Sequence, residues 1–350
     1  MKKSFFLTFG LIFFTSILFT INSNAQQLLT TPDISQAASV SQTIGLTKIT
    51  IDYHRPGVKG RVIWGKLVPY NEVWRAGANE NTTISFSDQV KINGQDLPAG
   101  TYGLHMIPTE NDWTIIFSKN IWSWGSFFYN QKEDALRIKV KPVTNEFREW
   151  LDYSFDDPSD TSVEVALQWE KMKIPFKVSV NVDKVVLNHF QMQLENLPGF
   201  NWRAFSQAAA YFLNKNDYLD QASKWIDRSI GMNKNGTNLW IKASILEKQG
   251  MNADAEKIKK DALSIATEQE INAFGYQYLF AKELDKAIDM FKMNVEKYPD
   301  SWNVYDSLGE AYNEKGEKGR SIKNYKKAYE MVTDDQNKQR IKNILDQLEN

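Results

Sequence analysis

The C-terminal part of this chain repeats itself, and the interval of the repeat restricts the folds open to it. Gly309 and Tyr325 are matched 34 residues earlier by Gly275 and Phe291. Small residues recur at spacings of 33, 32 and 34, at Ala222, Ala255, Ala287 and Ser321. A single helix pair of this length cannot bury its apolar face, so neighbouring pairs must stack. The interval therefore predicts an all-α array of helix pairs over residues 202–350.

The last repeat, SWNVYDSLGEAYNEKGEKGRSIKNYKKAYE, has a characteristic spacing of aromatic and small residues. Tyr305, Gly309 and Ala328 stand where tetratricopeptide repeats carry theirs. Residues 202–350 are therefore similar to the tetratricopeptide (TPR) family. The resemblance implies a curved array whose concave face holds a protein or peptide partner. The alternative is that a short array only packs against the preceding domain as a structural cap.

The preceding part of the chain has a different period. In KITIDY the apolar residues Ile49, Ile51 and Tyr53 alternate with polar ones, as in a half-buried strand. Asn93-Gly94 and Pro98-Ala99-Gly100 mark turns between further short apolar runs. This pattern predicts an antiparallel β-sandwich or barrel over residues 26–182. The fold class is thus two-domain, all-β plus all-α, with a connecting helical segment at 183–201.

The first 25 residues have the pattern of a secretory signal peptide. Lys2 and Lys3 precede an apolar run, and the small residues Ser23 and Ala25 end it. The alternative is a membrane anchor, because about 17 apolar residues reach the lower limit for a span. The small residues favour cleavage near Ala25. We therefore expect a periplasmic or secreted protein without a stable membrane anchor.

Composition excludes several classes of function. The chain has 42 Lys and Arg against 43 Asp and Glu, and this balance argues against nucleic acid as a partner. It has no cysteine, which excludes disulfides, thiolate metal sites and a cysteine nucleophile. The histidines His54, His105 and His189 lack the spacing of a zinc site. No known catalytic motif occurs, so we expect no metal, no cofactor and no assignable catalytic residue.

A basic, glycine-rich stretch, DYHRPGVKGRVIWGKLVPYNEVWRAGANENTT, is the main candidate site. Successive backbone N–H groups in glycine-rich turns can form an anion-binding concavity, and arginines add paired donors. We therefore expect a small anionic ligand here. The candidate ligand-binding residues are Asp52, Arg55, Lys59, Arg61, Arg75, Asn79 and Thr82. In its sharpest form, the hypothesis is that Arg55, Arg61 and Arg75 line one pocket with Asn79 and Thr82 at its rim.

Two other interpretations of this stretch stay open. In the first, Arg55 or Arg75 pairs with Asp52 or Glu72 and holds the shape of the loop. The polar side chains Asn79, Thr82 and Thr83 then only satisfy backbone groups of the turn. In the second, the domain is an enzyme that holds an anionic substrate with its arginines and uses Asp52 or His54 as a general base. The preferred interpretation is a non-enzymatic binding or scaffold protein, because no catalytic motif accompanies the arginines.

An aromatic cluster, IWSWGSFFYN at 121–130, forms a second feature of the β domain. If buried, it is a lid over the open end of the domain, and the strand that follows favours this interpretation. If Trp122 or Trp124 is exposed, the cluster is suited to stacking on sugar rings or to holding an apolar partner. A glycan is therefore a second candidate ligand.

The motifs of the β domain also resemble a known family. DYHRPGVKGRVIWGKLVPYNEVWRAGANENTTISF, LPAGTYGLHMIP, WTIIFSKN and WEKMKIPF are similar to the domain of unknown function 2911 (DUF2911). The resemblance covers roughly residues 36–180. It implies an exported bacterial β-rich domain, sometimes followed by tetratricopeptide repeats, and it implies no particular reaction. His54 stands where a serine is more usual, which weakens a catalytic role for that histidine.

Overall fold

The computed structural model describes residues 32–350, so the expected signal peptide lies outside the described residues. The chain divides into two compact units, Met1–Val185 and Val186–Asn350. Helix α1, Val182–Leu194, begins where the expected connecting segment begins and runs across this division. Among residues 32–350, no helix is both long enough and apolar enough to cross a membrane.

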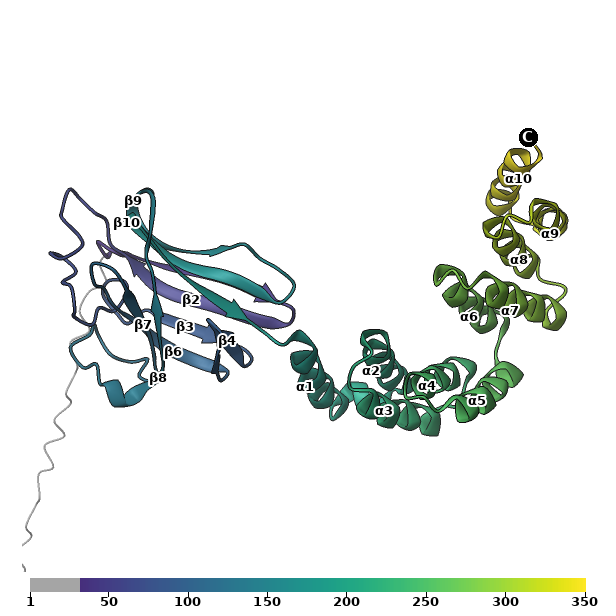
Figure 1. The fold of residues 1–350 in the computed structure, drawn as a ribbon, viewed down its shortest axis with the longest axis horizontal. Helices are drawn as coiled ribbons and strands as arrows, with labels where there is room; N and C mark the ends of the chain where they lie inside the picture. Colours follow the sequence, from purple (N-terminus) through teal and green to yellow (C-terminus); the bar gives the residue numbers. More distant parts are fainter. Residues whose placement is uncertain (1–31) are drawn as a thin grey trace, which may run out of the picture. The chain divides into compact units, whose positions relative to one another are not determined.

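The described part of the first unit is built from two antiparallel sheets (Figure 1). The larger sheet has the strand order β1-β2-β3-β6-β7-β8, and the smaller one has the order β5-β4-β10-β9. The strands are β1 Gln36–Ile44, β2 Thr47–Arg55, β3 Thr83–Phe86, β4 Val90–Ile92, β5 Gln95–Leu97, β6 Gly100–Ile107, β7 Trp113–Ser118, β8 Asp134–Val140, β9 Val143–Asp156 and β10 Ser162–Ser179.

The two sheets share one hydrophobic core, which makes this unit a β-sandwich. Ile51 and Phe117 of the larger sheet are buried in the same cluster as Phe176 and Leu151 of the smaller sheet. The rings of Phe117 and Phe176 meet edge to face, with 5.8 Å between their centroids. The alternation in β2 places its apolar side chains in this core and its polar side chains outside. The predicted antiparallel β domain is confirmed.

Four tryptophans pack together within this core. Trp169 of β10 stacks on Trp74, with ring centroids 6.0 Å apart and an angle of 19° between the rings. Trp64 meets Trp74, Trp113 and Trp169 edge to face. Trp64 and Trp74 belong to the long connection between β2 and β3, so the cluster joins that connection to both sheets. Rings of this size contribute large buried areas.

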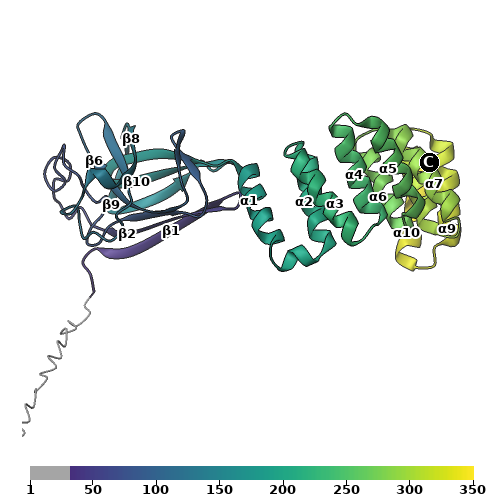
Figure 2. The ribbon, with the colours of Figure 1, turned by 90° about the horizontal axis from the view of Figure 1, so that it is seen from below.

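The second unit is an array of helices that pack in consecutive pairs: α2 with α3, α4 with α5, α6 with α7, and α8 with α9 (Figure 2). The helices after α1 are α2 Trp202–Lys215, α3 Leu219–Met232, α4 Gly236–Lys248, α5 Asn252–Ile265, α6 Glu268–Phe280, α7 Leu284–Lys297, α8 Trp302–Glu314, α9 Lys318–Met331 and α10 Asp335–Glu349. The predicted tetratricopeptide-like array is confirmed.

The small residues of the repeat lie between the helices of each pair. All four are fully buried, at Ala222, Ala255, Ala287 and Ser321. The recurring glycines also lie between paired helices. Gly275 faces the ring of Phe291, and Gly309 faces the ring of Tyr325. Each contact joins the first helix of a pair to the second. The periodicity of the sequence therefore reflects the close approach of paired helices.

We expect Gly275→Ala to destabilise the helical array by about 1–3 kcal/mol, because a methyl group here would overlap the buried ring of Phe291. Gly231→Ala in α3 is the matched control, since a methyl group there meets nothing within 4 Å. That change should leave stability equal or raise it by up to about 1 kcal/mol. Chemical denaturation followed by far-UV circular dichroism measures both. Equal effects of the two substitutions would contradict the tight packing at Gly275.

Candidate functional site

The connection between β2 and β3, residues 56–82, is irregular but firmly attached to the sandwich. At its start, the Val58 amide donates to the carbonyl of Glu149 in β9 over 2.8 Å. Further along, Trp74 and Met106 of β6 exchange two backbone hydrogen bonds, each 2.8 Å long. Both sheets therefore hold this connection, and its position does not depend on its own side chains alone.

The turn that follows Trp74 is held from inside the domain. The Ala76 carbonyl accepts hydrogen bonds from the hydroxyl of Tyr153 at 2.9 Å and from that of Thr82 at 3.3 Å. Ala76 is buried and has a φ of 52°, a left-handed conformation that costs energy for a residue with a side chain. Gly77 cannot carry a side chain, because the Thr82 hydroxyl occupies that space. The turn is thus fixed, and Arg75 projects from it.

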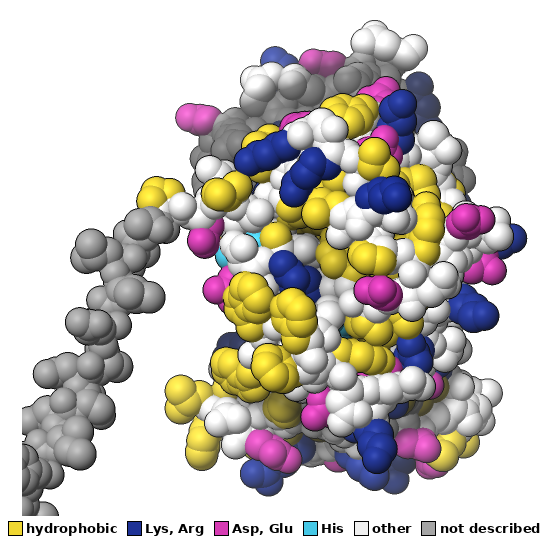
Figure 3. Space-filling model, turned by 90° about the vertical axis from the view of Figure 1, so that its left-hand side faces the viewer, with side chains coloured by type: hydrophobic (Ala, Val, Ile, Leu, Met, Phe, Trp, Pro, Cys, Tyr) yellow, Lys and Arg dark blue, Asp and Glu magenta, His cyan; other side chains and the backbone are white. Residues whose placement is uncertain are grey.

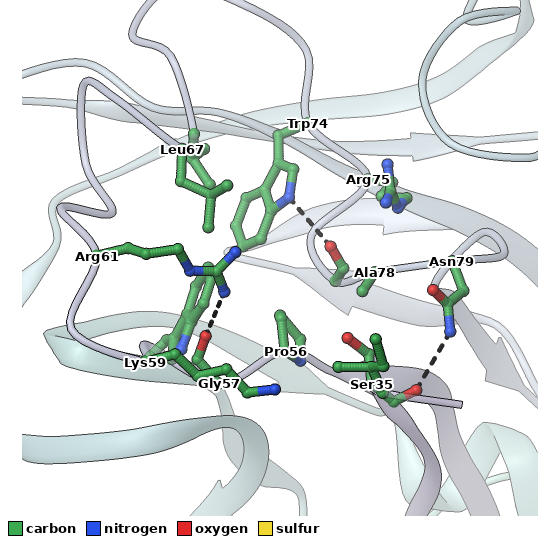
Figure 4. A pocket seen from close by; sticks show the side chains of 14 residues that line it. Ser35, Pro56, Gly57, Lys59, Arg61, Leu67, Trp74, Arg75, Ala78 and Asn79 are labelled. Atoms are coloured by element: carbon green, nitrogen blue, oxygen red, sulfur yellow. Dashed lines mark hydrogen bonds between the residues drawn. The ribbon is translucent and has the colours of Figure 1, made fainter. Parts of the chain in front are cut away.

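A pocket of about 340 Å³ opens beside this turn (Figure 4). Trp74 and Trp169 form an aromatic part of its wall. Its basic side chains are Lys59, Arg61 and Arg75, and its polar ones include Ser35 and Asn79. Asn79 donates from Nδ2 to the Ser35 carbonyl over 3.2 Å, which holds residues before β1 against the pocket.

Two of the three basic side chains are engaged by the protein itself. Arg61 donates from Nη2 to the Gly57 carbonyl at 2.6 Å and from Nε to the Val58 carbonyl at 3.1 Å. The Lys59 ammonium lies 5.7 Å from the ring centroid of Trp150, a cation–π contact. Arg61 thus stabilises the turn that it belongs to, and Lys59 lies at the edge of the pocket.

Arg75 lies beside an aromatic ring, as Lys59 does, but one of its nitrogens lacks a partner. Its Nε is buried and has no hydrogen-bond acceptor among the described residues. Burial lowers the pKa of Arg75, and the nearby charge of Glu80 opposes this effect. The guanidinium carbon lies 5.7 Å from the ring centroid of Trp124. In Figure 4, Arg75 and Arg61 lie on opposite sides of the pocket. Arg75 therefore lines the pocket with a guanidinium whose Nε is unsatisfied by the described residues.

The expectation that three arginines line one pocket is wrong for Arg55. Its Nε donates to the Leu151 carbonyl at 2.9 Å, and its Nη2 lies 3.9 Å from Asp152. These partners belong to β9, and they turn the side chain away from the pocket. Arg55 therefore links β2 to β9, and its partners are not Asp52 or Glu72, the carboxylates that the structural interpretation named.

Asp52 and Thr82 do not reach the pocket either. Asp52 lies on the exposed face of β2 and borders a separate hollow beside His54 and Glu80. Thr82 is fully buried, and its hydroxyl serves the Ala76 carbonyl instead of the pocket rim. Of the seven candidate residues, those that line the pocket are Lys59, Arg61, Arg75 and Asn79.

The enzyme interpretation requires a general base beside Arg75. The described residues that line the pocket include no Asp, Glu or His. His54 instead lies with its Nε2 3.3 Å from Glu80 and 3.9 Å from Asp33. Within residues 32–350, no three His, Cys, Asp or Glu side chains are grouped so that they could hold a metal ion. The described lining thus has cationic side chains that can bind an anion, and it has no carboxylate or imidazole that could act as a general base.

The aromatic cluster at 121–130 is largely exposed, so its interpretation as a buried lid is wrong. The exposed fractions are 89% for Trp122, 55% for Trp124, 78% for Phe127 and 70% for Phe128. The backbone of Trp124 pairs with that of Glu80, which brings the cluster beside the Arg75 turn. Figure 3 shows hydrophobic side chains gathered on this end of the β domain, with Lys and Arg side chains among them. The buried cluster of the sandwich core includes none of these four rings, so they do not cover it as a lid would.

The described residues thus form a β-sandwich with a loop-built pocket, followed by tetratricopeptide-like repeats. Residues 35–178 match the model of a family described as "Protein of unknown function (DUF2911)". This match spans the sandwich and confirms the resemblance expected from the loop motif. A search of curated proteins found no match.

Several solved structures are similar to less than half of this chain. MamA from Desulfovibrio magneticus RS-1 is 16% identical, with 42% of this chain and 82% of that chain covered and a TM-score of 0.28. YrrB, a TPR protein with an unusual peptide-binding site, is 18% identical, with 45% and 81% covered and a TM-score of 0.28. PilF from Pseudomonas aeruginosa is 14% identical, with 42% and 67% covered and a TM-score of 0.28. These scores are too low to say anything of partners.

Sequence reasoning missed several contributors to the site, among them Trp169 and the contact between Trp124 and Arg75. Trp169 lines the pocket from β10, far along the chain from the basic stretch. Trp124 lies against Arg75 from the aromatic segment. Nothing in the spacing of residues indicates either contact, because both depend on how the strands are ordered in the sheets.

Proposed function

We propose that this is an exported, non-catalytic binding protein. Its β domain binds a small anionic ligand in the pocket beside Arg75, and its helical repeats bind a protein or peptide segment. The observation that carries the proposal is the Arg75 guanidinium, which lines the pocket and whose buried Nε has no acceptor among the described residues.

A buried Nε without an acceptor is unfavourable, because this atom has lost water and gained no hydrogen bond in return. A carboxylate, phosphate or sulfate at this position would accept paired, charge-assisted hydrogen bonds. The volume of the pocket suits a ligand of modest size. An anion in the pocket would therefore offset part of the desolvation of Arg75.

The proposed role of the repeats rests on their architecture. Stacked helix pairs form an extended surface, and that surface serves recognition in many repeat proteins. The exposed Phe280, at the end of α6, leaves a large apolar side chain open to a partner. Export rests on the pattern of the first 25 residues. The alternative function, an enzyme with an anionic substrate, is less favoured because the lining lacks a general base.

Arg75→Ala tests the proposal directly. We expect the mature chain to show a thermal shift with at least one of phosphate, sulfate, acetate or a sugar acid. A ligand at a hundred times its Kd adds about 2.7 kcal/mol, or about 5–10 °C for a domain of this size. The shift should vanish in Arg75→Ala, while the melting temperature without ligand changes little, because the buried Nε has no acceptor to lose.

Arg148→Ala is the charge-matched control. Arg148 is an exposed residue of β9 that pairs with Asp152 at 3.4 Å and does not line the pocket. It should leave any anion-dependent shift unchanged. An equal loss of the thermal shift in both variants would indicate a general effect of charge and contradict anion binding in the pocket. The absence of a shift with every anion would contradict it as well.

A further inference from the structure

We infer that the anionic ligand of this pocket is an acidic saccharide. Its carboxylate or sulfate binds Arg75, and a neighbouring sugar ring stacks on the exposed aromatic side chains Trp122, Trp124, Phe127 and Phe128, which we call the aromatic platform. This inference rests on the proposed function, because it names the class of anion that the same pocket takes.

Arg75 lines the pocket and also contacts the aromatic platform. The guanidinium carbon of Arg75 lies 5.7 Å from the ring centroid of Trp124. A methyl group placed on Gly125 would come within 3.3 Å of Nη1 of Arg75 and within 3.2 Å of the Phe127 ring. Arg75 therefore lies against the Trp124–Phe127 segment. A ligand bound through its charge at Arg75 has aromatic surface within reach on one side.

Two rings of the platform are stacked on each other. The rings of Trp124 and Phe127 are nearly parallel, with 8° between their planes and 6.1 Å between their centroids. The cluster that forms the sandwich core contains none of the four platform side chains. Exposed apolar surface of this kind usually marks an interaction site, since water contacts it unfavourably.

The chemistry around the rings favours a sugar over an apolar peptide. The residues interspersed among the four aromatics are Ser123, Gly125 and Ser126, which are small and leave the ring faces accessible. Within residues 122–128 no side chain is aliphatic, and the aliphatic side chains nearby belong to the pocket lining, at Ile34, Leu67 and Val68. A pyranose presents C–H groups on its faces and hydroxyls at its edge, so it suits aromatic faces bordered by polar groups. The adjoining Arg75 adds the requirement for negative charge.

The test uses isothermal titration calorimetry with the mature full-length chain. The probes are tri-galacturonate, a sulfated chondroitin disaccharide, neutral maltotriose, and the simple anions acetate and sulfate. We expect at least one acidic saccharide to bind about tenfold or more tighter than both the simple anions and maltotriose. Arg75→Ala should abolish this binding.

Variants of the platform distinguish binding of the sugar ring from binding of the anionic group. Phe127→Ala and Trp122→Ala should each weaken binding of the acidic saccharide about tenfold. Both should leave the affinity for acetate or sulfate unchanged. Both side chains are mostly exposed, so folding should be retained. Phe147→Ala, which removes an exposed ring of β9 outside the platform, is the matched control and should change neither affinity.

The outcomes distinguish this inference from the proposed function. If simple anions bind through Arg75 and acidic saccharides bind no tighter, the inference of a saccharide ligand is wrong, whereas the proposal of an anion-binding pocket is supported. If no probe binds, both are wrong. Tighter binding of a diphenylalanine peptide with a free carboxylate than of any acidic saccharide would overturn the inference in favour of a peptide ligand. Unchanged saccharide affinity in both platform variants would overturn it as well.

Discussion

Trp169→Ala will destabilise the β domain by about 3–5 kcal/mol, the cost of removing a large aromatic side chain from a core. Trp169 is 1% exposed and contacts both Trp64 and Trp74. These two belong to the connection that forms the pocket, so its aromatic attachment to β10 is lost with the ring. Anion binding should weaken in the same variant even at temperatures where the domain stays folded.

Differential scanning calorimetry of the mature chain measures this effect, because the transition of the β domain can be compared between variants. Trp122→Ala is the control: it removes the same ring from a site that is 89% exposed, and we expect a change within about 0.5 kcal/mol. A loss at Trp169 no larger than that at Trp122 would show that the tryptophan cluster does not hold the domain together.

Acidification from pH 7 to pH 5 will cost the β domain about 2 kcal/mol through one histidine. His105 is 2% exposed on β6, and burial lowers its pKa to about 4. Its Nδ1 lies 3.5 Å from the Ser126 hydroxyl, and the Tyr129 ring packs beside it.

The sign follows from the direction of the shift. The folded-state pKa of His105 lies below its ordinary value of 6.5, so the folded protein keeps the ring neutral while the unfolded chain takes a proton. The contribution to stability is therefore complete above pH 6.5, declines as the pH falls, and levels off below about pH 4.

Urea unfolding at several pH values tests this in the wild type and in His105→Leu. The variant cannot titrate at this position, so its stability should fall less steeply between pH 7 and pH 5. The comparison uses slopes, because leucine also changes the packing around residue 105. Parallel slopes in the two proteins would contradict a neutral, buried His105.

The fold was predictable because its patterns are local. Alternation in β2 and the recurring small residues of the repeats follow directly from how a strand or a helix pair buries one face. The candidate site was only partly predictable. Lys59, Arg61, Arg75 and Asn79 share one connection, and a single stretch of sequence brings them together.

The remaining residues were assigned wrongly or missed because their positions depend on distant partners. Arg55 turns to Leu151 and Asp152 of β9, and no local pattern indicates that direction. Trp169 reaches the pocket through the pairing order of the smaller sheet. The aromatic segment has the composition of a core strand, but the core was already filled by other rings.

The clamped Ala76 carbonyl has a consequence for binding kinetics. Since Tyr153 and Thr82 hold the turn from inside the sandwich, the proposed binding of an anion at Arg75 requires no rearrangement of this backbone. Little conformational entropy is then lost on association, and no loop closure limits the rate. We therefore expect ligand exchange to be fast, with differences in affinity between ligands appearing in how slowly each one leaves.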